Sequence, residues 1–600
     1  MERIKVDLRL SETLTPFGVG AIVDVRGASL IGTDTSYWDL RHAPEISCDR
    51  LVARLGRGTL RQAPTHSGHV AARTPSLEYR RFPEWRFCER CESLSRKTGR
   101  KNGKWINTCE CGGALVPMRY VAVCAKGSHL QDIPWFLWAH RGHDEGVTEE
   151  VRFCKAYKQL KFRRTSSFSE GLSALNVFCA ACKRSRSLSA LVGEPSLARD
   201  GIKCEGRQPW QRSDDAVPCE QPVIAKQRGA TSNYMADTLS AIDIPFGTPE
   251  SMERIERIWA HPDFSRLSED NGGPRSEMIA GFIADDLGVQ LDDVMKALVA
   301  EADEERPLLG LKDGEWAAFV KKLAQGRDTT SSDFVVDGQQ FDPENAQSSI
   351  LTERISGIGQ VRRLREVRAL RRFQRHSPEA DFIPTDLGPL AGRKPVFPAL
   401  ELFGEGIFLR FNEEFISTWE RHPEVQLRAQ VLEGRRRKES WSARLDEAEP
   451  RYVGLHTLAH LLVRRLAYTS GYSAASLQER IYAHSDREDR TAGILIFTGA
   501  GDSQGTLGGL VRQGAPERLA PLIIGALDHA ETCSNDPVCI EMDRPGSTQL
   551  NLSACHGCAL ISETSCESRN QLLDRKLVFG GDGIPGLLQG VLEEVRGAAR

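Results

Sequence analysis

Paired cysteines are the residues of this chain whose type and spacing are best suited to chemistry. Sixteen cysteines occur among 600 residues, mostly as close pairs. Two thiolates at a tight turn can bind one Zn²⁺, and a second pair from a neighbouring turn completes a tetrahedral site. The spacing predicts three such sites, which are Cys88, Cys91, Cys109 and Cys111, then Cys179, Cys182, Cys204 and Cys219, and finally Cys539, Cys555, Cys558 and Cys566. Each has four sulfur ligands and leaves no position for water, so we expect about three structural zinc ions.

Disulfide bonds are the alternative use of paired cysteines. The chain opens Met1-Glu-Arg-Ile-Lys-Val-Asp7 without an apolar signal segment, and no stretch is apolar and long enough to span a membrane. We therefore expect a cytoplasmic protein, in which thiols stay reduced and close pairs more often bind metal. Cys48, Cys124 and Cys154 lie outside the three predicted sites and are expected to be buried single thiols.

An arginine-rich segment is the second candidate for binding. The formal net charge is only −3, so no global field draws the chain towards nucleic acid, and any DNA contact needs a local patch. Eight arginines occur from Arg354 to Arg375. A helical period would place four of them on one face, namely Arg362, Arg365, Arg368 and Arg372. That face would meet DNA phosphates, a partner's carboxylates or acidic residues of the chain itself.

The patterns of common enzymes are incomplete here. His456 and His460 are four residues apart, but Thr457 replaces the glutamate of the metalloprotease motif, so core or interface histidines are expected. Ser503 stands in a formal Gly-x-Ser-x-Gly match, several residues beyond the nearest predicted strand. Cys124 has no indicated base beside it. No P-loop is present, and we expect the chain not to be an enzyme.

Composition and periodicity predict a multidomain α+β protein, because 600 residues are too many for one hydrophobic core. We expect a strand and loop segment over 1–75, a zinc-ribbon-like region with two four-cysteine sites over 76–245, a mainly helical Arg- and Glu-rich region over 246–398, and an α/β zinc-binding domain over 399–600. In the last region, apolar periodicity predicts strands at 406–411 and 493–498 and helices at 413–421 and 456–468. Ser476 and Glu479 have the spacing of a capping box and predict a further helix start.

Several motifs together resemble a known family. The C-terminal ones are Gly493-Ile-Leu-Ile-Phe497, Gly501-Asp-Ser-Gln-Gly-Thr-Leu-Gly-Gly-Leu-Val511, Cys533-Ser-Asn-Asp-Pro-Val-Cys539, Asn551-Leu-Ser-Ala-Cys-His-Gly-Cys558, Glu563-Thr-Ser-Cys566 and Leu573-Asp-Arg575. They are similar to the MrfA-type zinc-binding domain found beside superfamily 2 helicases. Further matches, such as Phe17–Asp24, Cys124–Trp135 and Leu364–Leu370, make the whole chain resemble the DrmB family of the bacterial anti-phage system DISARM. At Ser128-His-Leu-Gln131 the chain departs from the expected Gly-His-Leu-Asp.

The resemblance implies a non-catalytic, helicase-associated subunit in antiviral defence by restriction of phage DNA. Its partner would be a DrmA-type helicase, which would hold the ATP, and DNA would be bound and remodelled by the complex. The resemblance also carries over the C-terminal zinc ligands, with Cys533 as the substitute for Cys539.

Two other classes of function remain open at this stage. One is a stand-alone DNA-binding protein that contacts nucleic acid directly through its zinc ribbons. The pI near 6.6 argues against this class, because such proteins usually have a stronger basic balance. The other is an enzyme with an unrecognised site around Cys124 or Ser503. A helicase encoded beside this chain would favour the helicase-associated subunit. Salt-sensitive DNA binding by the isolated chain would favour the stand-alone DNA-binding protein. Turnover without a partner would favour the enzyme.

Overall fold

The computed structural model describes residues 8–598 with short gaps. The gaps lie at 26, 56–57, 65–76, 97–98, 102–103, 107, 142–153, 166–169, 194–195, 213–215, 217–218, 245–256, 260, 271–274, 303–308, 329–332, 346–347, 388–393, 439, 486–489, 500–507 and 542–548. Ser503 therefore lies outside the described residues. Within the described part, no helix is apolar enough over a sufficient length to cross a bilayer.

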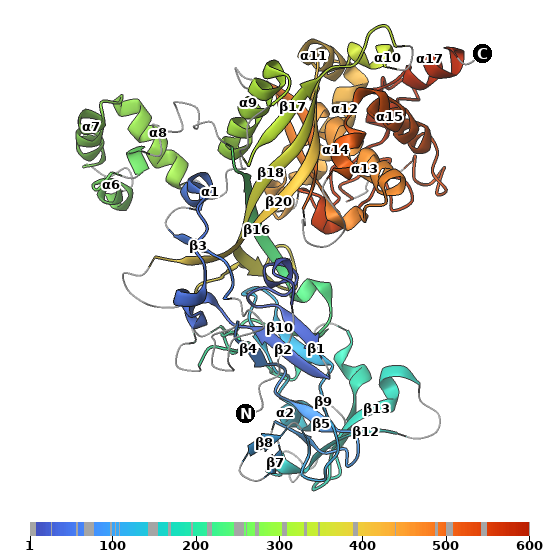
Figure 1. Cartoon of the computed structure of the whole chain (residues 1–600). Coiled ribbons are helices and arrows are strands. Elements are labelled where there is room, and N and C mark those ends of the chain that lie inside the picture. Colours follow the sequence, from blue (N-terminus) through green and yellow to red (C-terminus); the bar gives the residue numbers. More distant parts are fainter. Residues whose placement is uncertain are drawn as a thin grey trace. The chain divides into compact units, whose positions relative to one another are not determined.

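The chain forms two compact units, and neither is a continuous stretch (Figure 1). The first unit comprises Met1–Ser47, Arg57–Leu239 and Arg368–Leu400, and the second comprises Cys48–Gly56, Ser240–Val367 and Glu401–Arg600. Three of the five passages of the chain between the units lie within strands, which are β16 (Met235–Ile242), β18 (Ile355–Gln374) and, at the Leu400–Glu401 bond, β20 (Val396–Phe411). The sequence led us to expect four consecutive domains instead.

Short antiparallel sheets and turns make up the first unit, as the sequence predicted. Its strands are β1 (Ile22–Val25), β2 (Ala28–Gly32), β3 (Thr59–Arg61), β4 (Tyr79–Arg81), β5 (Arg86–Cys88), β6 (Leu94–Ser95), β7 (Gly99–Lys101), β8 (Lys104–Ile106), β9 (Leu115–Pro117), β10 (Tyr120–Cys124), β11 (Leu130–Gln131), β12 (Leu160–Arg164), β13 (Leu175–Cys179), β14 (Ser185–Ser187), β15 (Val223–Gln227) and β19 (Ile383–Pro384). Its helices are α2 (Trp135–His140) and α4 (Ser196–Arg199). The three-stranded sheets β6-β5-β9, β11-β10-β15 and β12-β13-β14 carry most of its cysteines at their ends.

The core of the cysteine-rich region is small. Trp135 and Trp138 of α2 pack edge to face at 5.6 Å and are buried with Val177. Cys124 and Cys179 belong to the same apolar cluster. Strands of two to five residues cannot bury much apolar surface, so modules of this size usually need an additional cross-link such as a metal ion.

A β-sheet with helices on both faces forms the second unit. Its strands follow the order β18-β20-β22-β21, with β17 paired to β18, where β17 is Val335–Gln339, β21 is Leu477–His484 and β22 is Thr491–Thr498. Its helices are α1 (Asp49–Arg54), α6 (Phe264–Asp270), α7 (Ser276–Leu287), α8 (Leu291–Ala302), α9 (Leu309–Gln325), α10 (Ser349–Thr352), α11 (Glu413–Glu420), α12 (Pro423–Arg436), α13 (Pro450–Ser470), α14 (Gly509–Gln513), α15 (Pro516–Ala530), α16 (Lys576–Phe579) and α17 (Val591–Ala598). The α/β character expected for the C-terminal region and the mixed fold class are confirmed.

Alternation along the strands explains the layers of this unit. In β22, Ile494 and Ile496 face the core formed with α13 and α15, whereas Leu495 and Phe497 face the opposite core with α9. Successive strand residues point to opposite faces, so a continuous apolar run is what a strand buried on both faces requires. The helix α13 is buried along most of its length, begins with a proline at its first turn and ends at Gly471 in a left-handed conformation.

Two sequence predictions of helices are wrong. The arginine-rich segment is the strand β18, which lies between β16 and β20 in the sheet. Its apolar residues are buried by the neighbouring strands, and this tertiary pairing outweighs the helical spacing of the arginines. The supposed capping box opens no helix, because Ser476 ends a short 3₁₀ turn and Glu479 lies in β21.

Candidate metal centres

Cysteine and histidine side chains of the described residues gather in four sets, and a fifth set also contains a glutamate. In each set the four ligand atoms lie within 4.8 Å of one another. The first cluster is Cys88, Cys91, Cys109 and Cys111, the second is Cys124, His129, Cys204 and Cys219, the third is His140, Cys154, Cys179 and Cys182, and the fourth is Cys533, Cys539, Cys555 and Cys558. The fifth set is His456, His460, Glu479 and Cys566. All sixteen cysteines are free, and only Cys48 belongs to none of the sets found in the described chain.

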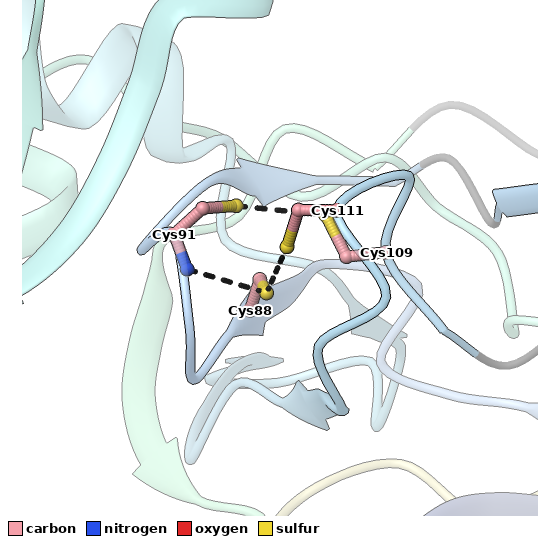
Figure 2. Close-up of side chains that lie close together, drawn as sticks. All are labelled: Cys88, Cys91, Cys109 and Cys111. Carbon is pink, nitrogen blue, oxygen red and sulfur yellow. Dashed lines mark hydrogen bonds between the residues drawn. The ribbon is translucent and has the colours of Figure 1, made fainter.

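The first cluster has the predicted members (Figure 2). The Sγ atoms of Cys88 and Cys111 are 3.4 Å apart, and those of Cys91 and Cys109 are 3.6 Å apart. A tetrahedral ion with Zn–S bonds of about 2.3 Å would separate its sulfurs by about 3.8 Å. The backbone N–H of Cys91 also donates to Cys88 Sγ at 3.5 Å, which stabilises a thiolate there. The four residues therefore fit a closed zinc site.

The turns around this cluster leave little room for other side chains. Cys88 ends β5, and the residue after its pair, Glu92, has a φ of 62°. Gly112 follows the second pair with a φ of 84°. At Gly113 a Cβ would lie 2.6 Å from Cys88 Sγ, so only glycine lets the backbone approach the sulfur this closely.

The predicted grouping of the next four cysteines is wrong. Cys179 and Cys182 lie with Cys154 and His140, where the Sγ atoms of Cys154 and Cys179 are 3.9 Å apart and Cys182 Sγ is 3.3 Å from His140 Nε2. The reason is topological, since Cys179 ends β13 and this turn packs against the end of α2, which carries His140.

The second cluster contains the other two cysteines of that prediction. Cys204 Sγ is 3.4 Å from His129 Nδ1, and Cys219 Sγ is 3.9 Å from Cys124 Sγ. Cys124 ends β10, and β10 pairs with β15, whose first residue follows Cys219 by four positions. Strand pairing therefore brings these segments together across about a hundred residues of sequence. The sequence predicts three four-ligand sites, whereas the described residues form four cysteine and cysteine–histidine clusters.

Hydrogen bonds hold the ligands of these two clusters in place. Backbone N–H groups of Gly127 and Gly206 donate to the sulfurs of Cys124 and Cys204 at 3.2 and 3.3 Å. His140 Nδ1 lies 2.7 Å from the carbonyl oxygen of Phe136, so Nδ1 donates and the lone pair of Nε2 faces Cys182. A backbone carbonyl that accepts from the other ring nitrogen in this way fixes the tautomer and orientation of a metal-binding histidine.

The departure from the family pattern at residues 128–131 lies beside the second cluster. Ser128 has a φ of 53°, the left-handed conformation that glycine adopts most easily, and its hydroxyl accepts from Arg375 N at 3.0 Å. Gln131 accepts from Glu205 N at 2.7 Å and donates to Lys203 O at 3.2 Å. Gln131 thus fixes the two residues on either side of the ligand Cys204, which gives it a structural role.

The fourth cluster corrects the C-terminal prediction. Cys533 and Cys539 both take part, because the Sγ atoms of Cys533 and Cys555 are 3.5 Å apart and those of Cys539 and Cys558 are 3.7 Å apart. Cys566 is replaced by Cys533 and lies instead in the fifth set. The turn between Cys533 and Cys539 is fixed by Asp536, whose carboxylate accepts from Cys533 N and pairs with Arg575.

The environments of these sulfurs differ. Burial raises the pKa of Cys558 to about 11. Burial acts in the same direction on Cys555, but a hydrogen bond from the Asn535 side chain, together with neighbouring thiols and backbone N–H groups, lowers its pKa to about 6. Four sulfurs packed this closely cannot all become thiolates without a cation, and a divalent ion supplies that charge.

Comparison with known proteins assigns the family. The model of a domain of unknown function, DUF8724, matches residues 9–235, and the model of the MrfA Zn-binding domain matches residues 458–559. The chain is 31% identical over 581 residues to the DISARM protein DrmB of Bacillus paralicheniformis, an alignment that covers 92% of this chain and 96% of that protein. The chain belongs to the DrmB family of DISARM proteins.

The two matched regions of this DrmB-family chain contain different clusters. The first three clusters lie within residues 9–235, and all four cysteines of the fourth cluster lie within residues 458–559. The MrfA Zn-binding domain and the geometry of the sulfurs therefore agree on zinc for the C-terminal region. His456 and Cys566 of the fifth set lie outside the matched residues.

The arginines singled out from the sequence pair mostly with nearby acidic residues. Arg365 lies between Asp243 and Glu401 at 2.6 and 2.9 Å, and its side chain is only 12% exposed. Arg362 pairs with Asp337 at 2.8 Å. In the first unit, Arg372 pairs with Asp237 at 2.7 Å. Arg368 also has an interaction partner. The expected single helical face does not exist, and the carboxylates compete with DNA for at least three of the four arginines.

Histidine ligands were the signal that sequence reasoning missed. Cys124 and His129 are separated by four residues inside a motif that resembles the family, yet the spacing of the cysteines alone predicts a single thiol at Cys124. His140 lies 42 residues before Cys182, with nothing in the local sequence to link them. A short spacing reveals a pair of ligands, whereas the fold decides which pairs and which histidines share an ion.

Proposed function

We propose that this chain is a non-catalytic, zinc-binding subunit of a DISARM anti-phage system, which assists a DrmA-type superfamily 2 helicase in binding and remodelling DNA. The likeness to DrmB over 92% of the chain supports this proposal most strongly. ATP is held and hydrolysed by the helicase, and the subunit acts in the cytoplasm, where phage DNA is encountered.

Zinc has a structural role in this proposal. The residues that hold it are those of the four clusters, and each cluster offers four protein ligands, so no position is left for substrate or activated water. The ions cross-link turns that the small core of the cysteine-rich region cannot hold alone. A rigid surface of this kind suits contact with a protein partner, because binding then requires little ordering.

DNA contact by the isolated subunit is weak in this proposal. Basic and acidic side chains number 79 and 82, and the arginines of β18 mostly face carboxylates. Affinity for the DNA backbone requires unpaired positive charge, which the helicase therefore has to supply.

The test is co-purification with the helicase, followed by ATPase and DNA-binding measurements with and without the subunit. We expect a stable complex, no ATPase activity of the subunit alone, and DNA affinity of the complex above that of either part. Salt-sensitive DNA binding by the isolated chain, without complex formation, would instead support a stand-alone zinc-ribbon DNA-binding protein. Turnover by the isolated chain would contradict the non-catalytic role.

A further inference from the structure

The fifth set of side chains lies inside the apolar core of the second unit. His456 and His460 are one helical turn apart on α13, Glu479 lies in β21, and Cys566 follows a short 3₁₀ turn. His456 Nε2 is 3.0 Å from Glu479 Oε1 and 3.2 Å from Cys566 Sγ. His460 Nε2 is 3.3 Å from the same carboxylate oxygen. All four ligand atoms lie within 4.8 Å of one another.

Strand alternation places Glu479 on a face where its neighbours are apolar. Leu477 and Ile481, two residues before and after it, belong to the core shared with α13. The side chains of Glu479, His456 and His460 are 0% exposed. A carboxylate in such a place is strongly unfavourable unless a positive charge and hydrogen bonds compensate it.

The next residue of β21 shows how this chain compensates a buried charge on the other face of the sheet. Arg480 contacts Glu315 of α9 at 2.6 Å, and Tyr482 donates to the same carboxylate at 3.0 Å. Glu479 has no such arrangement. Within the described part of the chain, only the two imidazoles lie within ion-pairing distance of it, and its Oε2 atom has no hydrogen-bond partner.

The positions of the ring protons favour a cation at the centre of the set. His460 Nδ1 lies 2.9 Å from the carbonyl oxygen of Ala559, so Nδ1 carries a proton and donates it. In the neutral ring, Nε2 of His460 then directs a lone pair towards Glu479. This is the arrangement of a metal-binding histidine whose other nitrogen is held by a backbone acceptor.

Protonated histidines, without a metal ion, would not provide a hydrogen-bond partner for every polar atom of the four side chains. An imidazolium at His460 would pair with Glu479 Oε1, but the buried Glu479 Oε2 would still have no hydrogen-bond partner. A nucleophile triad does not fit either, because a triad needs the acid and the thiol at opposite nitrogens of the ring. Here the same Nε2 atom of His456 faces both, and its Nδ1 has no partner.

We propose that His456, His460, Glu479 and Cys566 form a fifth, buried site for a divalent transition-metal ion, with zinc as the expected ion. Two neutral imidazoles, a carboxylate and a thiolate carry a total charge of −2, which a divalent ion neutralises. Nitrogen, oxygen and sulfur ligands are all common for zinc, and four protein ligands make the site structural. The backbone N–H of Asn570 donates to Cys566 Sγ at 3.2 Å, as N–H groups do at the other clusters.

The fifth site would join the helix α13, the strand β21 and the segment that carries the fourth cluster. Ala559, which accepts from His460, directly follows the ligand Cys558. The two sites are nevertheless separate, since the fourth cluster is complete without Cys566. The proposal does not depend on a helicase partner, so its test and that of the proposed function can fail independently.

The test locates and counts zinc in the full-length chain purified from zinc-supplemented cells. Diffraction data at the zinc absorption edge should show an anomalous peak between the four side chains, in addition to peaks at the four clusters. Elemental analysis should give five zinc ions per chain, four for Cys566→Ala, and five for the matched control Cys48→Ala, which removes a buried thiol outside every set.

Peaks at the four clusters with none at the fifth set would overturn the proposal and leave the imidazolium–carboxylate pair as the explanation. An unchanged zinc content in a folded Cys566→Ala variant would overturn it as well. If that variant does not fold, the anomalous map of the unaltered chain still decides, because it requires no substitution.

Discussion

Replacing Cys124 by serine tests the division of the N-terminal cysteines into three sites. In the structure Cys124 is a ligand of the second cluster and fully buried, so Cys124→Ser should cost one zinc ion. The sequence-based grouping makes Cys124 a single thiol, and zinc content would then not change. The two groupings thus predict different results for one substitution.

The expected loss of affinity follows from the ligand count. A structural zinc site has an apparent binding free energy of about 10–16 kcal/mol, so one ligand of four accounts for about 2.5–4 kcal/mol. At about 1.4 kcal/mol per factor of ten, zinc should bind the second cluster two to three orders of magnitude more weakly. The N–H of Gly127 would also lose its sulfur acceptor, which is 3.2 Å away in the native chain.

The assay is zinc content after dialysis against a buffered series of free zinc concentrations. Cys124→Ser should release one ion at a higher free zinc concentration than the native chain does. Cys154→Ser should do the same through the third cluster, and Cys48→Ser should titrate like the native chain. Native-like zinc retention in folded Cys124→Ser protein would refute the assignment of the second cluster.

Three further substitutions test other parts of the structure. Gly113→Ala should weaken zinc at the first cluster, because its Cβ would lie 2.6 Å from Cys88 Sγ, whereas Gly229→Ala, which meets nothing within 4 Å, should leave the zinc titration unchanged. Glu315→Gln leaves the buried Arg480 without its carboxylate and should lower the free energy of unfolding of the second unit by about 3–5 kcal/mol in denaturant titration. The control Glu277→Gln, at an exposed position, should change this free energy by less than about 0.5 kcal/mol. Equal effects of the two substitutions would contradict the role of the ion pair. Arg365→Glu places three acids together and should cost about 1–2 kcal/mol, with its partly exposed partners limiting the effect, whereas Arg362→Glu, with a side chain 44% exposed, should be nearly neutral. Weaker DNA binding by the helicase complex with Arg362→Glu and normal assembly would show that this arginine reaches phosphate after all.

Local patterns predicted local structure well. The apolar run before Thr498 is a strand, and the segment from Glu413 is a helix because Asn412 caps it through its side chain and its apolar residues Ile416 and Trp419 are buried. The close cysteine pairs also identified sulfurs that do lie together. In each case the decisive interactions fall within a few residues of one another.

The sequence could not show what depends on distant segments. Arginines at helical spacing in β18 are overridden by pairing with β16 and β20, and Glu479 is placed in a strand by its pairing with β22. Likewise, Cys124 and Cys219 meet only because β10 pairs with β15. Neither the spacing of residues nor their secondary-structure propensity contains this information, because many different pairings of the same strands are compatible with the local sequence.

The interleaved course of the chain limits where it can be cut. The zinc-binding match at 458–559 begins inside α13, which packs on β21 and β22, and β22 pairs with β20, a strand that ends at Phe411. The opposite face of the sheet is covered by α9, which ends at Gln325. A fragment limited to the matched residues would therefore expose a bare sheet face and an unpaired strand edge, both of which promote aggregation. In this protein the segment that is recognisable by homology is not a unit that can be excised, and transplanting its zinc chemistry requires the helix α9 and the strands β18 and β20, all of which precede it in the chain.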